Sequence, residues 1–330
     1  MKCTVVGAGA WGTALANLLA ENGHETLLWA YEADVAESVN GHHENRRFLA
    51  GVALHPALRA TTDIERACAG AELVLFAPPS HVLRQVAAQA ARAVPAGAML
   101  VVATKGIERE RFALMTDVVE QEIPGRPIVA LSGPSFALEV AQHLPTAIVA
   151  ASADAAAAKA TQQALSTSAF RVYTQRDVVG VELGGALKNV MAVATGIADG
   201  LQLGFNARAA LITRGLAEMT RLGVRLGADP MTFMGLAGMG DLVLTCTGSL
   251  SRNRSVGLEI GRGATLAEVL HGRETVAEGV VTTESAKALA EREGVEMPIV
   301  NAVFRVLFEK QPARWALVEL MTRDLKGEHE

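Results

Sequence analysis

The sequence predicts an α/β protein in which a doubly wound parallel sheet is followed by a mainly α-helical domain. Three observations support this fold class. Short apolar runs alternate with helical stretches as far as about residue 175, a pattern typical of parallel sheets covered on both faces. A Gly-x-Gly-x-x-Gly motif separates the first strand from the first helix. Beyond Asp177 the strand-like runs disappear and long helical patterns replace them.

The glycine motif predicts the dinucleotide-binding turn of a Rossmann-like domain. A strand over 4–6 leads directly into the motif, and a helix is predicted over 13–20. Gly7 permits the tight turn, Gly9 lets the backbone approach a pyrophosphate, and Gly12 allows the helix to pack closely on the strand. The helix then directs its free N–H groups at the phosphates. The alternative interpretation is a purely structural glycine turn.

An acidic residue stands where the motif expects a ribose-binding carboxylate. The second predicted strand, 26–29, is followed by Glu32, twenty residues beyond Gly12. A helix over 33–40 and a loop over 41–47 come next. No cysteine, aspartate or third histidine stands at ligand spacing from the two adjacent histidines of that loop, so we expect a solvated loop and no metal site.

Further strands in the first half are followed by polar residues. Because ligands bind beyond the carboxyl ends of the strands in doubly wound sheets, Lys105 and the turn 132–135 are expected at the binding edge. The predicted strands are 73–77, 99–103, 128–131, 147–150 and 170–173, and helices are predicted over 82–93 and 154–165.

The second half is predicted to be helical. We place the domain boundary between residues 180 and 181, which gives a nucleotide-binding domain over 1–180 and a substrate domain over 181–330. The predicted helices are 181–201, 207–226, 251–262, 282–293 and 297–309.

Lys188 is the one charged residue of the apolar stretch 183–198. A buried lysine costs several kcal/mol unless it is paired or neutral. One interpretation is a buried stem whose ammonium reaches solvent. The other is a lysine whose pKa, ordinarily about 10.4, is lowered by burial and neighbouring cations, which makes it a usable base. Asn189 beside it is a candidate to orient a substrate hydroxyl.

Two polar groups of the helical half also suit a site. Asp241 follows Gly238 and Gly240, which suggests a tight turn that presents a carboxylate. Arg252 lies between Ser251 and Asn253, and this combination of a guanidinium with hydroxyl and amide donors suits a phosphate. The alternative interpretation makes Asp241 a helix N-cap and Ser251 an ordinary helix start.

Composition excludes several classes of protein. The 330 residues are 50% hydrophobic and 20% charged, which is too apolar for disorder, and a net charge of −5 argues against a nucleic-acid surface. The scattered cysteines Cys3, Cys68 and Cys246 suit a reducing cytoplasm and neither a disulfide framework nor a zinc site.

One uncharged stretch has the composition of a signal peptide or membrane span. It covers 3–20, but its glycines and Asn17 make that interpretation the weaker one. We find no other stretch long and apolar enough to span a bilayer, and we expect a cytoplasmic protein without integral membrane association.

Six motifs, in order, make the chain resemble the NAD(P)-dependent glycerol-3-phosphate dehydrogenases, and the bacterial biosynthetic type in particular. The resemblance runs from Lys2 to about Leu320. It implies reversible oxidation of sn-glycerol 3-phosphate to dihydroxyacetone phosphate with NAD or NADP, a role in phospholipid synthesis, and a homodimer. The motifs are Gly7–Gly12, Ala103–Gly106, Leu131–Ala137, Glu182–Val190, Gly238–Leu242 and Ser251–Arg254.

The resemblance also implies roles for individual residues, and it implies no metal. Lys188 matches the general base that exchanges a proton with the C2 hydroxyl, and Arg252 matches the contact to the substrate phosphate. Positions that match substrate contacts are Lys105, Gly133, Ser135, Lys188, Asp241, Ser251, Arg252 and Asn253. Positions that match cofactor contacts are Gly7, Gly9, Ala10, Trp11, Gly12, Tyr31, Glu32, Lys105, Ala137, Arg252, Val276 and Glu278.

The chain departs from the common bacterial pattern at two places. Ala10 stands where serine is frequent, and a backbone contact remains possible there. Tyr31 and Glu32 stand where many NADP-preferring members carry histidine or arginine. Since a carboxylate repels a 2′-phosphate, we expect this chain to tolerate or prefer NAD more than those members, although Arg46 and Arg47 could compensate.

Two other functions compete with this one. Another two-domain Rossmann dehydrogenase, acting on 3-hydroxy acids or nucleotide sugars, would lack the motifs at 238–241 and 251–254. A non-catalytic dinucleotide-binding sensor would predict loss of Lys188 or Arg252, and both are present.

Overall fold

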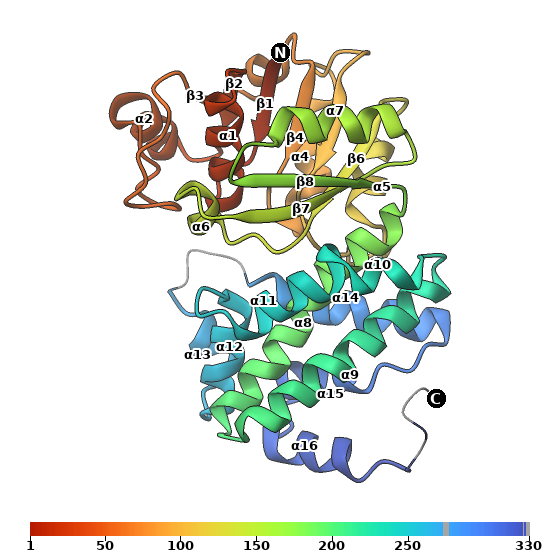
Figure 1. Cartoon of the computed structure of the whole chain (residues 1–330). Helices are drawn as coiled ribbons and strands as arrows, with labels where there is room; N and C mark the ends of the chain where they lie inside the picture. The colour runs from red at the N-terminus through yellow and green to blue at the C-terminus, as the bar shows by residue number, and fades with distance from the viewer. Residues whose placement is uncertain (273–276, 326, 328–330) are drawn as a thin grey trace.

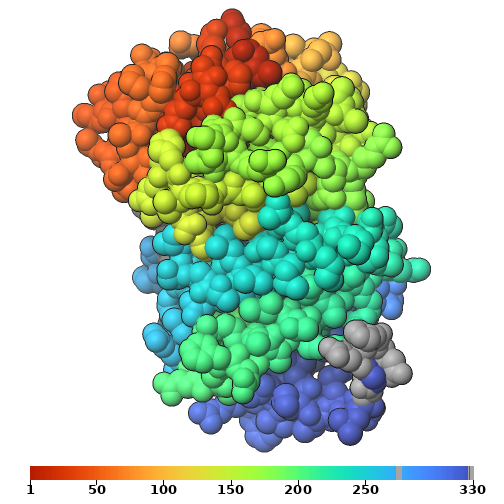
Figure 2. Space-filling view, in the orientation of Figure 1, coloured from red at the N-terminus to blue at the C-terminus, as the bar shows by residue number. Residues whose placement is uncertain are grey.

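The computed structural model describes residues 1–272, 277–325 and 327. Figure 1 shows a sheet-containing half, formed by the N-terminal part of the chain, above a helical half. Figure 2 shows the two halves in direct contact, with the sheet half seated on the helical half. The predicted fold class is confirmed.

The sheet has eight strands in the order β3-β2-β1-β4-β5-β6-β7-β8. The apolar runs of these strands are buried because helices cover both faces of the sheet. Side chains of α1, α2 and α7 pack on one face, and side chains of α3, α4 and α5 pack on the other. The strands are β1 Lys2–Val6, β2 Glu25–Trp29, β3 Arg59–Thr61, β4 Leu73–Phe76, β5 Met99–Val102, β6 Ile128–Ser132, β7 Thr146–Ala151 and β8 Phe170–Gln175.

The expectation of a wholly parallel sheet was wrong for the last two strands. β1 to β6 pair in parallel, but β7 pairs antiparallel with β6 and parallel with β8. The link between β6 and β7 carries only α6, Ala137–Ala141, which advances about 8 Å. A return along a strand covers about 17 Å, which this helix does not span, and β7 starts at the edge where β6 ended.

The helices of the sheet half follow the predicted alternation. The first, α1, begins at Ala10 inside the glycine motif and continues through the apolar residues after it. Their bounds are α1 Ala10–Glu21, α2 Ala33–His42, α3 Ile64–Cys68, η1 Ser80–Val82, α4 Leu83–Ala90, α5 Met115–Glu122, α6 and α7 Ala155–Leu165.

The helical half is organised around α8, Val178–Gly200, whose residues 180–198 are all buried. The predicted boundary at residue 180 falls inside this helix. The other elements are α9 Gly204–Arg225, α10 Pro230–Met234, η2 Leu236–Gly240, α11 Asp241–Thr247, α12 Arg252–Gly261, α13 Leu266–Leu270, α14 Glu278–Glu293, α15 Pro298–Phe308 and α16 Ala313–Met321.

The expectation that no further stretch is long and apolar enough to span a bilayer was also wrong. By length and composition alone, α8 is long and apolar enough to cross a membrane. However, 89% of its apolar window is buried inside the protein. Its hydrophobicity reflects contact with neighbouring helices on every side.

Candidate active site

The glycine motif forms a tight turn at the carboxyl end of β1. Gly7 has φ +114°, and a Cβ there would lie 2.7 Å from the backbone nitrogen of Pro78. A Cβ on Gly12 would clash with the carbonyl oxygen of Gly7. A Cβ on Gly9, by contrast, would meet no atom within 4 Å. Gly7 and Gly12 therefore satisfy the packing of the turn, while Gly9 leaves open space at the start of α1.

The start of α1 also carries polar groups without protein partners. Ala10 is its first residue, and no side chain caps the helix. The indole Nε1 of Trp11 is buried and, among the described residues, makes no hydrogen bond. Since a buried donor without an acceptor is costly, this arrangement fits a ligand that brings acceptor oxygens to the helix N-terminus.

The end of β2 presents the acidic residue that the motif predicted. Glu32 precedes α2 and, among the described residues, its carboxylate has no hydrogen-bond or ion-pair partner. Tyr31 beside it is 81% exposed. The two arginines that could compensate are engaged, because Arg46 pairs with Glu44 at 3.1 Å and Arg47 with Asp34 at 3.6 Å.

Two lysines meet on one carboxylate at the junction of the two halves. Asp241 is fully buried at the start of α11. Lys105, which follows β5, donates from Nζ to Asp241 Oδ2 at 2.7 Å and to the carbonyl of Gly133 at 3.1 Å. Lys188 of α8 donates from Nζ to Asp241 Oδ1. The carboxylate therefore pairs with both lysines, and the N-cap interpretation of Asp241 was wrong.

Lys188 is 8% exposed, so the interpretation of an ammonium that reaches solvent was wrong. Burial lowers the pKa of Lys188 to about 8; Asp241 acts in the opposite direction and Lys105 adds to the lowering. A lysine with this pKa exchanges a proton readily near neutral pH.

Two glycines of α8 allow this cluster to form. A Cβ on Gly185 would lie 2.5 Å from Ser132 Oγ and 3.5 Å from Lys105 Cγ, and one on Gly184 would clash with the carbonyl of Ala237. Because Gly184 and Gly185 have no side chains, the ends of β5 and β6 and the turn before Asp241 contact α8 directly. This contact lies one helical turn before Lys188.

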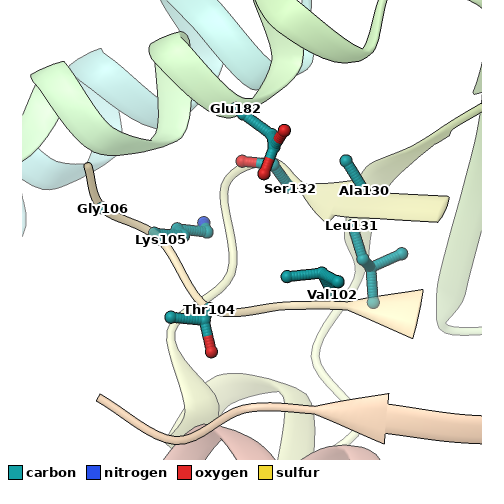
Figure 3. Close-up of a pocket in the computed structure, with 8 residues that line it drawn as sticks. All are labelled: Val102, Thr104, Lys105, Gly106, Ala130, Leu131, Ser132 and Glu182. Carbon is teal, nitrogen blue, oxygen red and sulfur yellow. The ribbon is translucent and has the colours of Figure 1, made fainter. Parts of the chain in front are cut away.

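A small cavity lies behind this contact. It has a volume of about 10 Å³, which is near the lower limit for one water molecule. Ser132 lines it with a buried hydroxyl that has no hydrogen-bond partner in the described part of the chain. Figure 3 shows Lys105, Ser132 and Glu182 around it, together with Val102, Thr104, Gly106, Ala130 and Leu131.

Arg252 is the first residue of α12. Its side chain is exposed, and within the described residues it has no hydrogen-bond or ion-pair partner. Ser251 caps the helix, since its Oγ accepts from the N–H of Arg254 at 3.2 Å. The interpretation of Ser251 as a helix start is therefore right about its local structure. The guanidinium beside it, which interacts electrostatically with Glu278, suits an anion.

Asn253 ties the start of α12 to two other helices. Its Nδ2 donates to Asn189 Oδ1 of α8 at 2.9 Å, and its Oδ1 accepts from the N–H of Gly279 in α14 at 2.9 Å. Arg252 is thus held near the middle of α8, the part of that helix that also carries Lys188.

The other predicted positions lie around these groups. Ser135 donates from Oγ to the carbonyl of Gly133 at 3.0 Å, and Ala137 begins α6. Glu278 begins α14 and accepts hydrogen bonds from Ser80, a residue that the sequence analysis did not single out. Val276 lies outside the described residues. Within the described residues no group of three or more His, Cys, Asp or Glu side chains could hold a metal ion.

Two family models match the chain, one over residues 2–158 and one over 177–318. They are described as NAD-dependent glycerol-3-phosphate dehydrogenase N-terminus and C-terminus. The chain belongs to this family. It is therefore an NAD(P)-dependent oxidoreductase. This confirms the resemblance inferred from the six motifs, and it confirms the predicted dinucleotide cofactor.

Individual relatives match over nearly the whole chain. Glycerol-3-phosphate dehydrogenase [NAD(P)+] of Geobacter sulfurreducens is 57% identical over 327 residues, 98% of each chain. The enzyme of the same name from Myxococcus xanthus is 51% identical over 331 residues, 99% of each chain. The crystal structure of glycerol-3-phosphate dehydrogenase from Coxiella burnetii is 40% identical, has a TM-score of 0.94 and covers 98% of this chain and 99% of that chain. These matches set aside the two competing functions.

Proposed function

We propose that the chain interconverts sn-glycerol 3-phosphate and dihydroxyacetone phosphate, with Lys188 as the general acid and base and Arg252 on the substrate phosphate. One observation carries this proposal. Lys105 and Lys188 share the buried carboxylate of Asp241 where the two halves meet, beside the edge at which a doubly wound sheet binds its ligand.

The residues at the start of α1 fit a dinucleotide. Open space over Gly9 and the unpartnered Nε1 of Trp11 supply room and a donor, and we assign Gly7–Gly12, Tyr31, Glu32, Lys105, Ala137, Arg252, Val276 and Glu278 to the cofactor. When bound, the nicotinamide accepts or supplies the hydride at C2.

Lys188 handles the proton. In the oxidation, its neutral amine takes the C2 hydroxyl proton while the C2–H bond breaks and its electron pair leaves as hydride. In the reduction, its ammonium returns that proton to the C2 oxygen. With a pKa of about 8, both forms are accessible near neutral pH. Lys105 keeps a positive charge beside the oxygen, where negative charge develops.

Arg252 and its neighbours bind the phosphate. The free guanidinium at the first residue of α12 combines with the positive end of the helix dipole. The Oγ of Ser251 accepts a hydrogen bond from the N–H of Arg254, so its hydroxyl proton can be donated to the phosphate. We assign Gly133, Ser135, Asp241 and Asn253 to the rest of the substrate site.

The test follows oxidation of NADH and NADPH by dihydroxyacetone phosphate. Lys188→Ala should lower kcat by about a thousandfold with the Kd of NADH unchanged, and Arg252→Ala should raise the KM of dihydroxyacetone phosphate by about a hundredfold. Lys159→Ala, on the exposed side of α7, is the matched control. A wild type that binds NADH but leaves dihydroxyacetone phosphate unreduced would overturn the substrate, and a Lys188→Ala enzyme that keeps its rate would overturn the base.

We also infer a cytoplasmic homodimer that supplies glycerol 3-phosphate for phospholipid synthesis, with nucleotide-binding and substrate domains over 1–180 and 181–330. The resemblance to the biosynthetic type supports the role and the dimer. Three buried cysteines without disulfides suit a reducing compartment. Light scattering of the purified protein measures the oligomeric state.

A further inference from the structure

Ser80 lies at the point of the sheet where the connections reverse. It opens η1 and is separated from the end of β4 by three residues, and β4 neighbours β1 on the side opposite to β2. In doubly wound sheets the dinucleotide crosses this point, with one nucleotide over each side. Since Glu32 follows β2 on the ribose side, Ser80 stands on the side that receives the nicotinamide half.

Ser80 is bonded to the helical half of the protein. Its N–H and Oγ donate to the carboxylate oxygens of Glu278 at 3.1 Å and 2.5 Å, between residues 198 positions apart in the sequence. Ser80 is 6% exposed. Burial raises the pKa of the Glu278 carboxyl, while the bonds from Ser80 and the charges of His81 and Arg252 favour its ionised form.

The loop after β5 closes around the same pair. A Cβ on Gly106 would lie 2.5 Å from Ser80 Cβ, 2.9 Å from Ser80 Oγ and 3.7 Å from Glu278 Oε2. Gly106 follows Lys105, which pairs with Asp241. The ends of β4 and β5 and the start of α14 therefore meet next to the lysine cluster.

We propose that Ser80 is a positioning residue that holds Glu278 over the nicotinamide half of the dinucleotide crevice. This inference rests on the proposed cofactor site, and it adds a residue and a subsite to it. With the hydroxyl in place, the carboxylate has a fixed direction at the start of α14. Without it, Glu278 keeps only the backbone N–H of residue 80 as a donor from this loop.

The test uses calorimetry on the free enzyme to measure the Kd of two ligands. One is NADH, and the other is ADP-ribose, which lacks the nicotinamide. Ser80→Ala should raise the Kd of NADH about tenfold and leave that of ADP-ribose within about twofold. Glu278→Gln, a second variant at the same contact, should show the same split. In turnover, the KM of NADH should rise by more than kcat falls.

Thr116→Ala is the matched control. Thr116 donates from Oγ to Glu182 of α8 at 2.5 Å and so also joins the two halves, but it follows β5 and precedes β6. Its loss should leave both Kd values within twofold. Equal weakening of NADH and ADP-ribose by Ser80→Ala, or the same NADH loss in Thr116→Ala, would overturn the positioning role. A wild type that binds neither ligand would instead overturn the cofactor site.

Discussion

At the scale of single residues, the balance of charge around Asp241 dominates the site. One carboxylate holds two ammonium groups, so one net positive charge remains when both lysines are protonated. Burial makes that charge costly, and Lys188 gives up its proton more easily for this reason. The same residual charge favours a phosphorylated substrate with a developing oxyanion.

Glu32 permits a prediction about cofactor choice. Its carboxylate has no partner in the described residues, whereas Arg46 and Arg47 already pair with acids. Glu32→Ala should therefore raise the NADPH-to-NADH ratio of kcat/KM by about tenfold, because a nearby negative charge repels a 2′-phosphate by about 1 kcal/mol or more. Steady-state kinetics with both cofactors measures the ratio.

Glu37→Ala provides the comparison for this prediction. Glu37 is an exposed acid on α2, and solvent and salt screen its charge, so its loss should change the ratio by less than twofold. An unchanged ratio in Glu32→Ala would show that another residue discriminates between the cofactors.

The residues of the site differ in how far the sequence could predict them. Lys188 is conspicuous because it is the one charged residue of the apolar stretch 183–198. Its partner Asp241 lies 53 positions away, and the pairing depends on close contact at two glycines of α8, which no local pattern reveals. Ser80 gives no signal beyond its place after a buried strand and two prolines.

At the scale of elements, the crossing of α8 and α12 positions Arg252. Glycines spaced four apart face each other, Gly196 and Gly200 on α8 and Gly257 and Gly261 on α12, and a Cβ on any of them would clash with backbone of the opposite helix. The two backbones therefore touch, and the start of α12 reaches Asn189.

Gly257→Ala should disturb this crossing. Its Cβ would clash with the carbonyl of Val193, so α12 must shift. Overpacking of this kind costs about 1–3 kcal/mol of unfolding free energy, and the displaced Arg252 should raise the KM of dihydroxyacetone phosphate several-fold. Denaturant unfolding and steady-state kinetics measure the two effects.

Gly41→Ala is the control for the crossing. Gly41 lies in α2, where a Cβ would meet nothing within 4 Å, so alanine should be neutral or stabilise by up to about 1 kcal/mol. If Gly257→Ala leaves both stability and KM unchanged, the backbone contact does not position Arg252.

Strand and helix patterns predicted most elements but not their direction. The apolar runs identified seven of the eight strands because each is long enough to be buried as a unit. β3 has only three residues and was missed. A run of buried residues does not indicate the direction in which its strand pairs. The antiparallel pairing of β7 with β6 depends instead on the short helix in the link before β7.

At the scale of the whole molecule, two buried glutamates hold helix starts. Glu182 of α8 accepts from the N–H and Oγ of Thr116 at the start of α5, which joins the two halves. Glu218 of α9 accepts from the N–H of Ile299 at 2.8 Å at the start of α15. Burial raises the pKa of each carboxyl to about 7, although these hydrogen bonds act in the opposite direction.

These raised pKa values predict that stability falls as the pH rises from about 5 to about 7. In that range the folded state binds protons at Glu182 and Glu218 that the unfolded chain has released, so the unfolding free energy decreases with pH. A pKa raised from 4.5 to about 7 corresponds to about 3 kcal/mol for each group. Denaturant unfolding at several pH values measures the slope.

The double variant Glu182→Gln with Glu218→Gln should flatten this slope, while Glu120→Gln, at an exposed position of α5, should not. An equally steep slope in the double variant would assign the pH dependence to other groups.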